Sequence, residues 1–505
     1  MPPDNSCWRP ESHVAFADPI TRKLPLQVKD ASATDSGGNR TLRTHQILHS
    51  DLGPRIFILA FPTLLQQLLT FCVALFDTWL SGRIDAAATS AIGMAAYIGW
   101  LAGLLVSTVS VGTTAMVARH LGASDPAQAN RVMHVALIAG QFGSVGMSAL
   151  LYVLAPAFVA AFGLEGATGV IGLNYLRMDA VGHLLTGITF VGAAALRGSG
   201  DMARPMMVLG MINVLNMLLS CCFVYGIGPQ SPVMAPTEWV APMGIYGIAA
   251  GTVCARLLGG LMMSCVLVFG SGALKFRLRL LRLDPLIMQR LIGLGGFAAA
   301  DNLITWLGQF IFLIIIRNIT GMPFSADVIF AAHMVGVQVE AVTYLPAIAW
   351  GQSAAAIIGQ CLGARKIRRA FRAGISAVFQ CCMLGIIVTI VFYFGAEAIY
   401  RVMHSDPQIM MAGGAPFRVL ALFQIPLIVS LVLKFALHGA GDTRWPMIAT
   451  VAGTLLFRLP LAWLLGVYLE FGLLGAWTGM FVDITFRGVV LSWRYLGGRW
   501  LRQRI

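Results

Sequence analysis

The chain has 505 residues, of which 57% are hydrophobic and only 11% are charged, with a net charge of +13 and a mean hydropathy of +0.77. Soluble domains average about 25% charged residues, so this composition cannot cover a core with a water-facing surface. These values exclude a soluble enzyme, a disordered protein and a fibrous repeat, and they indicate a polytopic membrane protein.

The first 50 residues are polar, rich in Pro, Ser, Thr and Asp, and contain no apolar run long enough for a signal peptide. We predict that 1–50 is a disordered cytoplasmic tail. Beyond it, twelve apolar runs are long enough to cross roughly 30 Å of hydrocarbon, and only helices satisfy their own backbone there. The predicted spans are 56–80, 91–118, 132–157, 170–196, 205–227, 245–270, 286–316, 326–361, 373–398, 412–438, 446–468 and 472–493. The predicted fold class is therefore an all-α membrane protein with twelve transmembrane helices.

The 35 Lys and Arg residues are unevenly distributed. Twenty-six lie in the two chain ends and in alternate loops, such as ARKIRRAFR at 364–372, whereas the opposite loops hold only Arg83, Arg317 and Arg401. Because basic loops remain in the cytoplasm, we predict that both termini are cytoplasmic and that the protein lies in the inner (plasma) membrane. The positive charge reflects this asymmetry, so we expect no nucleic-acid partner.

An internal repeat divides the chain. LRGSGDMARPM at 196–206 matches LHGAGDTRWPM at 437–447 with an offset of 241 residues, and LGA at 121–123 matches LGA at 362–364 with the same offset. Each repeat contains six predicted spans, an even number, so both halves have the same topology. We therefore expect two lobes related by a pseudo-two-fold axis along the membrane normal, as in repeat-built transporters.

The repeat also sets the expected domain organisation. The tail is followed by an N-terminal six-helix lobe at 51–270, a basic cytoplasmic linker at 271–285, a C-terminal six-helix lobe at 286–496 and a basic C-terminal tail at 497–505.

Several motifs resemble the multidrug and toxic compound extrusion (MATE) family of bacterial type. They are GDMARPM and GDTRWPM after the fourth helix of each half, LFDTWLSG at 75–82, and AAHMVGVQVEAVTYLPAIAWGQSAAAIIGQCLGA at 331–364. The resemblance covers 51–496. It implies a twelve-helix, two-lobe antiporter that exports amphiphilic, often cationic compounds in exchange for H⁺ or Na⁺. Such a protein is not an enzyme and needs no cofactor other than the coupling ion.

Three intramembrane acids are candidate cation-coupling residues, because a charge in hydrocarbon costs about 2.5–3.5 kcal/mol even on lenient scales. Asp77 matches the acid that the resemblance places in the first helix, although it could instead reach the headgroups. Asp301 lies one turn before the position of the family's seventh-helix acid, where Thr305 stands. Glu340 lies in the eighth predicted span and could instead be a buried network partner.

Four polar residues are candidates for the substrate cavity. Asn213 and Asn216 are one helical turn apart, so both amides could reach one ligand, or they could bond neighbouring helices. His333 shares a helix face with Glu340, and Gln338 lies between them. Ser220 stands where some family members carry Asp, which puts an N-lobe site with two carboxylates in doubt.

The repeated turn motif and one proline are expected to act structurally. Pro62 lies inside the first helix and permits a kink, and the resemblance implies that this helix bends. The motif residues, which we expect to hold the turn and its partner helix, are Gly200, Asp201, Arg204, Pro205, Gly441, Asp442 and Pro446.

Two alternative functions are compatible with a polytopic membrane protein. A flippase for lipid-linked saccharides shares the architecture but should line its cavity with several basic residues. An intramembrane enzyme needs a nucleophile–base pair or a metal cluster, and the chain contains no HExxH or GxSxG motif. We therefore expect no catalytic residues and no metal site. The expected partners are small organic cations or amphiphiles and the lipid bilayer, and the expected oligomeric state is a monomer.

Overall fold

A computed structural model describes residues 47–48, 50–84, 86–226, 241–269, 273–320 and 323–503, with the backbone alone at 86–91 and 278. The predicted tail at 1–50 lies almost wholly outside these residues. Ile47, near its end, is fully buried in the same apolar cluster as Leu59 and Trp350, so packing against the helices already begins there.

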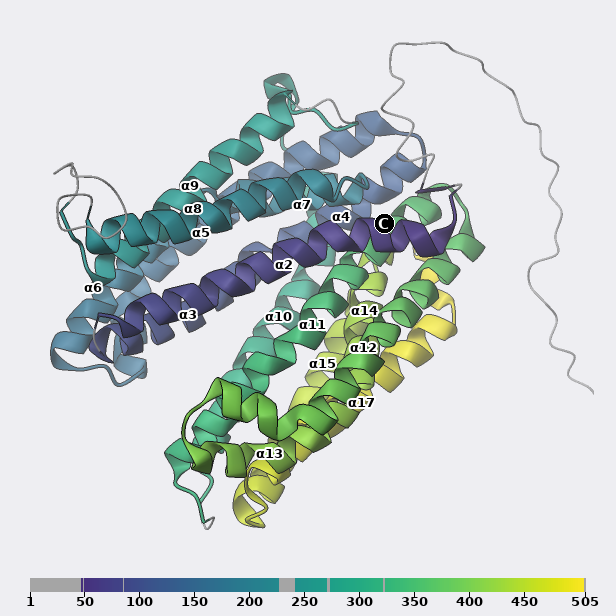
Figure 1. The fold of residues 1–505 in the computed structure, drawn as a ribbon. Helices are drawn as coiled ribbons and strands as arrows, with labels where there is room; N and C mark the ends of the chain where they lie inside the picture. The colour runs from purple at the N-terminus through teal and green to yellow at the C-terminus, as the bar shows by residue number, and fades with distance from the viewer. Residues whose placement is uncertain are drawn as a thin grey trace, which may run out of the picture. The chain divides into compact units, whose positions relative to one another are not determined.

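From Leu52 onward, the described residues of the first half form eight α-helices and one short 3₁₀ turn at His183–Leu185 (Figure 1). The helices are α2 (Leu52–Gly82), α3 (Ala86–Val106), α4 (Thr108–Gly122), α5 (Pro126–Ala161), α6 (Gly166–Gly182), α7 (Thr186–Gly198), α8 (Ala203–Tyr225) and α9 (Ile245–Phe269).

The second half follows a linker with a 3₁₀ turn at Leu278–Leu280. Its helices are α10 (Pro285–Arg317), α11 (Ala326–Gly363), α12 (Ile367–Met403), α13 (Pro407–Leu422), α14 (Gln424–Ala440), α15 (Arg444–Ala452), α16 (Leu459–Trp463) and α17 (Gly472–Leu496). Two π-helical stretches, Gly453–Arg458 and Leu464–Tyr468, flank α16, and a 3₁₀ turn at Arg499–Arg502 follows α17.

Several of these helices start at a capping residue that is visible in the sequence. Asp125, Asp284 and Asp406 each precede a proline at the first helical position, and each carboxylate accepts a bond from a backbone N–H of the first turn. Proline fits this position because its missing N–H would have no partner there. These caps define the starts of α5, α10 and α13.

The predicted fold class is confirmed. The described residues contain eleven helical segments long and apolar enough to cross a membrane, and a bent pair, α13 and α14, makes a twelfth. The pair bends by 55° at Phe423, within the predicted span 412–438. Pro426, in the first turn of α14, cannot donate a backbone bond to the preceding helix, which explains the break there.

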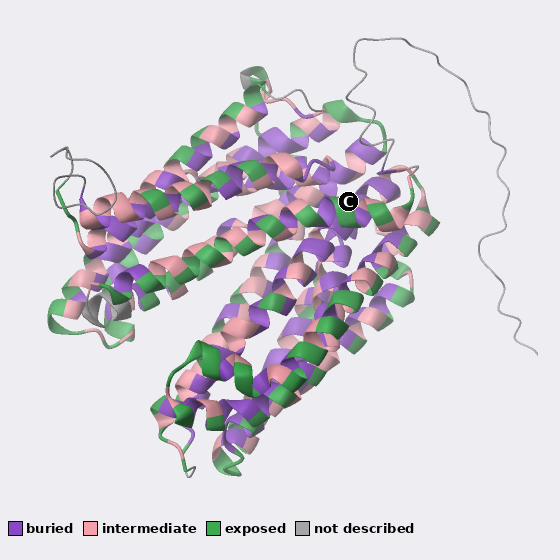
Figure 2. Cartoon of the chain, viewed as in Figure 1, coloured by how far each residue is buried: buried purple, intermediate pink, exposed green. Residues whose placement is uncertain are grey.

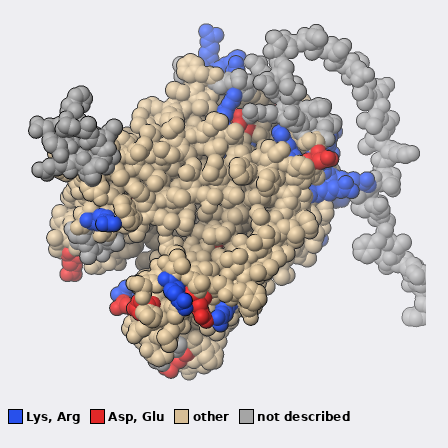
Figure 3. Space-filling model, in the orientation of Figure 1, with Lys and Arg blue, Asp and Glu red and all other residues tan. Residues whose placement is uncertain are grey.

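Side chains on the outward helix faces are apolar and exposed. Phe394 and Val402 on α12 are 81% and 86% exposed, for example. Figure 2 shows exposed residues along the outer helix faces and buried ones between the helices. In Figure 3 a broad uncharged surface separates Lys, Arg, Asp and Glu residues that gather near the helix ends. This pattern suits helices surrounded by lipid.

Helix α2 packs against both halves of the chain. Ile56 and Leu59 in its first half share an apolar cluster with Trp350 of α11 and Ala373 of α12. Farther along, Thr70 accepts a hydrogen bond from Asn213 of α8 at 3.0 Å. The long first helix therefore connects the two sets of helices beside the cavity described next.

Candidate functional site

A cavity of about 330 Å³ lies between the two halves of the chain. Residues of α2, α3, α4 and α7 form one side, and residues of α10, α11 and α14 form the other. Its polar lining consists of Gln67, Ser107, Ser110, Thr114, Arg197, Asn302, Gln352, Lys434 and His438. Transporters built from repeats bind substrates at the interface between the repeats, so this cavity is the candidate substrate site.

The charged groups of the cavity are basic. Arg197 of α7 donates from Nη1 to Oε1 of Gln66 at 3.4 Å, and Lys434 of α14 lies on the opposite side. No Asp or Glu is among the described residues that line the cavity. The cavity therefore presents positive rather than negative charge to a ligand.

Three other lining side chains hold buried polar atoms for which the described residues provide no hydrogen-bond partner. They are Oγ of Ser110, Oε1 of Gln352 and both ring nitrogens of His438, which is only 6% exposed. A buried polar group without a partner costs about 1–3 kcal/mol. A ligand that bonded to these groups would recover that cost.

Asp301 lies directly behind the cavity wall. Its side chain is fully buried, and Oδ2 is 2.5 Å from Nζ of Lys434. Thr305, where the family resemblance places an acid, donates instead to the backbone carbonyl of Asp301 at 2.8 Å. The Asp301 carboxylate is therefore paired with the Lys434 ammonium.

Asp77 lies in α2, outside that cavity. It is half-buried, and its Oδ1 has no hydrogen-bond partner among the described residues. Asp179 of α6 and Arg256 of α9 are near enough to act on it electrostatically. Arg256 Nη1 is 2.8 Å from Asp179 Oδ1, so the arginine is already paired with the other acid. Asp77 is thus a half-buried carboxylate whose buried Oδ1 accepts no hydrogen bond from the described residues.

Asn213 and Asn216 bond two different helices. Asn213 donates to Thr70 of α2, whereas Asn216 donates to Thr252 of α9 at 2.9 Å. Ser220 donates to Oδ1 of Asn216 at 3.5 Å. The two amides therefore form hydrogen bonds to two different neighbouring helices, α2 and α9.

Glu340 and His333 are both buried in α11 but have different surroundings. Gln424 and Arg458 lie close enough to act on the Glu340 carboxylate. His333 accepts a hydrogen bond at Nδ1 from the indole N–H of Trp477 at 3.0 Å and packs edge-on against that ring. Because this nitrogen accepts, the neutral ring carries its proton on Nε2. Gln338, between them, is half-buried.

A family model described as MatE matches residues 62–222 and 298–464, more than half of the chain. The chain belongs to the MatE family. The two matched blocks fall in the two halves of the repeat, and they include Asp77, Asp301 and Glu340. The resemblance to the multidrug and toxic compound extrusion family is thereby confirmed, and MatE proteins are transporters and not enzymes.

Relatives of this MatE protein match over most of their length. The probable multidrug resistance protein NorM of Thermotoga maritima is 27% identical over 454 residues, which are 88% of this chain and 93% of the relative. A FAD transporter of Shewanella oneidensis is 22% identical over 429 residues, 84% of this chain and 90% of the relative.

A solved structure shows the same fold. It is a MOP superfamily transporter from Pyrococcus furiosus, for which reverse polarity of the binding pocket is stated to suggest a different function. It superposes with a TM-score of 0.82 at 19% identity and covers 91% of this chain and 98% of its own. The two-lobe architecture expected from the repeat is consistent with this fold.

The MatE protein contains a buried cluster that sequence reasoning missed. Asp179 is contacted by Arg256 and by His183, whose Nε2 is 3.5 Å from Asp179 Oδ2. Asp179 lies in the last turn of α6 and His183 follows directly after that helix, so their four-residue spacing could have indicated the contact from the sequence. Arg177, the nearest basic residue in sequence, instead lies over the ring of Tyr152 at 5.1 Å.

A second missed group lies in the C-terminal half. Arg487 lies one helical turn after Asp483 in α17, and its Nε is 2.5 Å from Asp483 Oδ1. Arg458 Nε lies 2.9 Å from Oδ2 of the same acid. Two guanidinium groups share one buried carboxylate, so the cluster near Glu340 carries positive charge.

The repeated turn motif of the MatE protein is used differently in its two copies. Gly200 and Gly441 both have positive φ, of 83° and 85°, which favours glycine. Asp201 caps its turn and pairs with Arg204 three residues later at 3.5 Å. Asp442 pairs with Arg494 of α17 at 2.7 Å.

Asp201 and Asp442 have different partners because the arginine that follows each of them lies at a different spacing. The residue equivalent to Arg204 is Trp445, and Arg494 lies over that ring at 5.2 Å. Arg444 is only two residues after Asp442 and is exposed. Pro205 and Pro446 are both buried at the starts of α8 and α15. Pro62 lies inside α2, which continues through it without a break.

Proposed function

We propose that this MatE transporter is a secondary antiporter that exports amphiphilic compounds from the cytoplasm in exchange for H⁺ or Na⁺, as a monomer in the inner membrane with both termini cytoplasmic. The proposal rests on Asp77, a half-buried carboxylate in the first span whose buried Oδ1 has no hydrogen-bond partner among the described residues. A coupling site must gain and lose a cation in each cycle, and a free carboxylate oxygen is suited to that exchange.

Among the three candidate acids, Asp77 has the surroundings that best fit coupling. Asp301 is in contact with the ammonium group of Lys434, and Glu340 lies near the Arg458–Asp483–Arg487 cluster. A cation that approached Asp301 or Glu340 would therefore be repelled by these positively charged side chains. Asn216, Ser220 and Thr252 are joined by hydrogen bonds and supply further oxygen atoms in the same lobe.

The charge of the substrate is a separate question. The family resemblance predicts organic cations, but Arg197, Lys434 and His438 in the cavity favour acidic amphiphiles. One relative is a FAD transporter, and FAD carries a negatively charged pyrophosphate. An exporter of acidic compounds is therefore the second candidate. A flippase for lipid-linked saccharides was also expected to have basic residues in its cavity. The same assay distinguishes that flippase from an antiporter.

The test uses purified protein in sealed vesicles with separately imposed proton and sodium gradients. Efflux of a cationic dye, an acidic dye and a lipid-linked saccharide is compared under each gradient. Gradient-driven movement of either dye supports the antiporter, and the preferred dye identifies the substrate charge. Movement of the lipid-linked saccharide alone would replace the antiporter with the flippase.

A further inference from the structure

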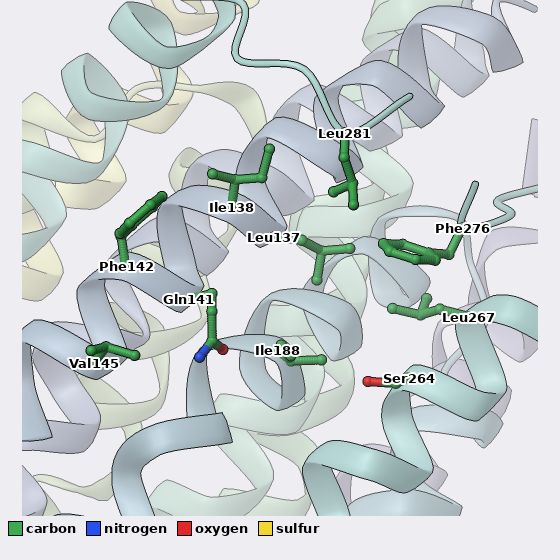
Figure 4. A pocket seen from close by; sticks show the side chains of 10 residues that line it. All are labelled: Leu137, Ile138, Gln141, Phe142, Val145, Ile188, Ser264, Leu267, Phe276 and Leu281. Atoms are coloured by element: carbon green, nitrogen blue, oxygen red, sulfur yellow. The ribbon is translucent and has the colours of Figure 1, made fainter. Parts of the chain in front are cut away.

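An apolar groove of about 390 Å³ lies on the outer side of the first half, between α5, α7, α9 and the linker (Figure 4). Eight of its ten lining residues are apolar, and Phe142 at its edge is 73% exposed. The two polar ones, Gln141 and Ser264, donate hydrogen bonds to the backbone carbonyls of Leu184 and Gly260. The groove is therefore suited to an aliphatic chain that enters from the surrounding lipid.

A basic cavity of about 470 Å³ adjoins this groove. Leu280 lines the cavity and the next residue, Leu281, lines the groove. The cavity contains Arg131, Arg279 and Arg282 together with one acid, Asp284. The Asp284 carboxylate already accepts bonds from the first backbone N–H groups of α10, at 3.0 and 3.2 Å. Three guanidinium groups and one acid leave the cavity positively charged.

The linker that carries two of these arginines is bound to α5. The N–H of Lys275 donates to Oδ1 of Asn130 at 2.8 Å, and the N–H of Arg277 donates to Nε2 of His134 at 2.9 Å. The Phe276 ring stacks on the His134 ring at 5.2 Å. Arg279 and Arg282 are thus presented on a backbone that is already ordered, so little conformational entropy is lost when a ligand binds.

We infer that the groove and the basic cavity together bind one anionic phospholipid, with its phosphate against the arginines and an acyl chain in the groove. The order of charge and apolar surface along α5 matches that of a lipid. Arg131 lies in the second turn of α5, and the groove extends from Leu137 to Val145, about 12 Å along the helix. That length fits within half of a roughly 30 Å hydrocarbon layer. Basic pockets beside transmembrane helices are known to favour anionic headgroups.

This site does not depend on what the transporter exports, so it can be tested by binding alone. The purified full chain is titrated with phosphatidylglycerol or phosphatidylcholine of identical acyl chains, and retained lipid is counted by native mass spectrometry. Glycerol 3-phosphate is added as a competitor to represent a free phosphate. We expect tight retention of phosphatidylglycerol, weak retention of phosphatidylcholine and no displacement by glycerol 3-phosphate.

Two variants test the two parts of the site. Arg279→Gln with Arg282→Gln should weaken phosphatidylglycerol binding by about 25-fold, roughly fivefold for each arginine, without changing phosphatidylcholine binding. Arg365→Gln with Arg368→Gln, which removes two exposed arginines at the start of α12, is the matched charge control. Ser264→Phe should fill the groove and reduce retention of phosphatidylglycerol even though all three arginines remain. Val489→Phe, on an exposed position of α17, adds the same ring elsewhere.

Thermal unfolding of each variant confirms that it is folded. Equal retention of the two lipids, displacement by glycerol 3-phosphate, or unchanged binding in both site variants would overturn the proposal.

Discussion

Gly122 and Gly363 occupy equivalent positions in the two repeats, and each packs against the backbone of the other half. A Cβ atom on Gly122 would lie 2.0 Å from the carbonyl oxygen of Gln360, and one on Gly363 would lie 2.0 Å from that of Arg119. Arg119 and Gln360 are themselves separated by the repeat offset of 241. The contact is therefore reciprocal, as a two-fold relation requires.

Gln360 strengthens this contact between the halves by donating from Nε2 to the carbonyl of Gly198 at 2.9 Å. Alternating access requires that such contacts form and separate in each cycle. The glycine pair is therefore a contact that holds the two halves together at the end of the molecule where the LGA loops lie.

Gly122→Ala and Gly363→Ala should each weaken this contact and lower transport, with a steric cost of about 1–3 kcal/mol. Gly296→Ala is the matched control, because an added Cβ there meets nothing within 4 Å. Vesicle efflux, measured at equal protein level, checks the prediction. Wild-type transport by both glycine variants would show that close approach of these loops is not needed.

Asp77→Asn should abolish ion-coupled efflux while the protein remains folded and inserted. The change keeps the shape of the side chain and removes the charge that attracts and releases a cation. Asp301→Asn and Glu340→Gln are made in parallel, and efflux is measured under imposed gradients. Coupling would belong to the second half if Asp77→Asn transported at the wild-type rate while Asp301→Asn was inactive.

Asp301 and Lys434 should behave as a coupled pair. Lys434→Met leaves a fully buried carboxylate without its partner, which costs about 3–5 kcal/mol for a buried ion pair. The double change Asp301→Asn with Lys434→Met should recover most of that stability, because no uncompensated charge remains. Thermal unfolding in detergent measures the effect. Additive losses in the double variant would contradict a direct pair.

The two ends of α12 should label from opposite sides of the membrane. Arg368 and Val402 are exposed near these ends, and the charge asymmetry predicts that Arg368 is cytoplasmic. Single cysteines at 368 and 402, in a chain without its nine native cysteines, are treated with an impermeant reagent in intact cells. Only position 402 should react. Labelling at 368 would reverse the predicted topology.

Deleting residues 1–45 should leave insertion and transport largely intact, because this polar segment has no apolar face to pack. Deleting 1–50 should instead lower the melting temperature. Ile47 is fully buried, and Arg369 Nη2 donates to its carbonyl at 2.8 Å. The melting temperature and the efflux rate of each deletion variant are compared with those of the full chain. Loss of efflux in the shorter deletion would reveal a role for the tail.

Composition and patterning alone determined the class of protein, its twelve spans and its repeat. Hydrocarbon imposes a simple requirement on length and polarity, so the spans were predictable one segment at a time. The candidate acids were also visible, because Asp77, Asp301 and Glu340 each interrupt an apolar run.

Only the tertiary structure decided which groups face those acids. Lys434 follows Asp301 by more than a hundred residues, so no helical spacing relates the two side chains. Helices α10 and α14 both pack against α11 and α4, and this arrangement places the Lys434 ammonium 2.5 Å from the acid instead. Arg494 likewise reaches Asp442 from a helix 52 residues away. Helical spacing reports neighbours within one helix, whereas partners across helices depend on how the helices pack.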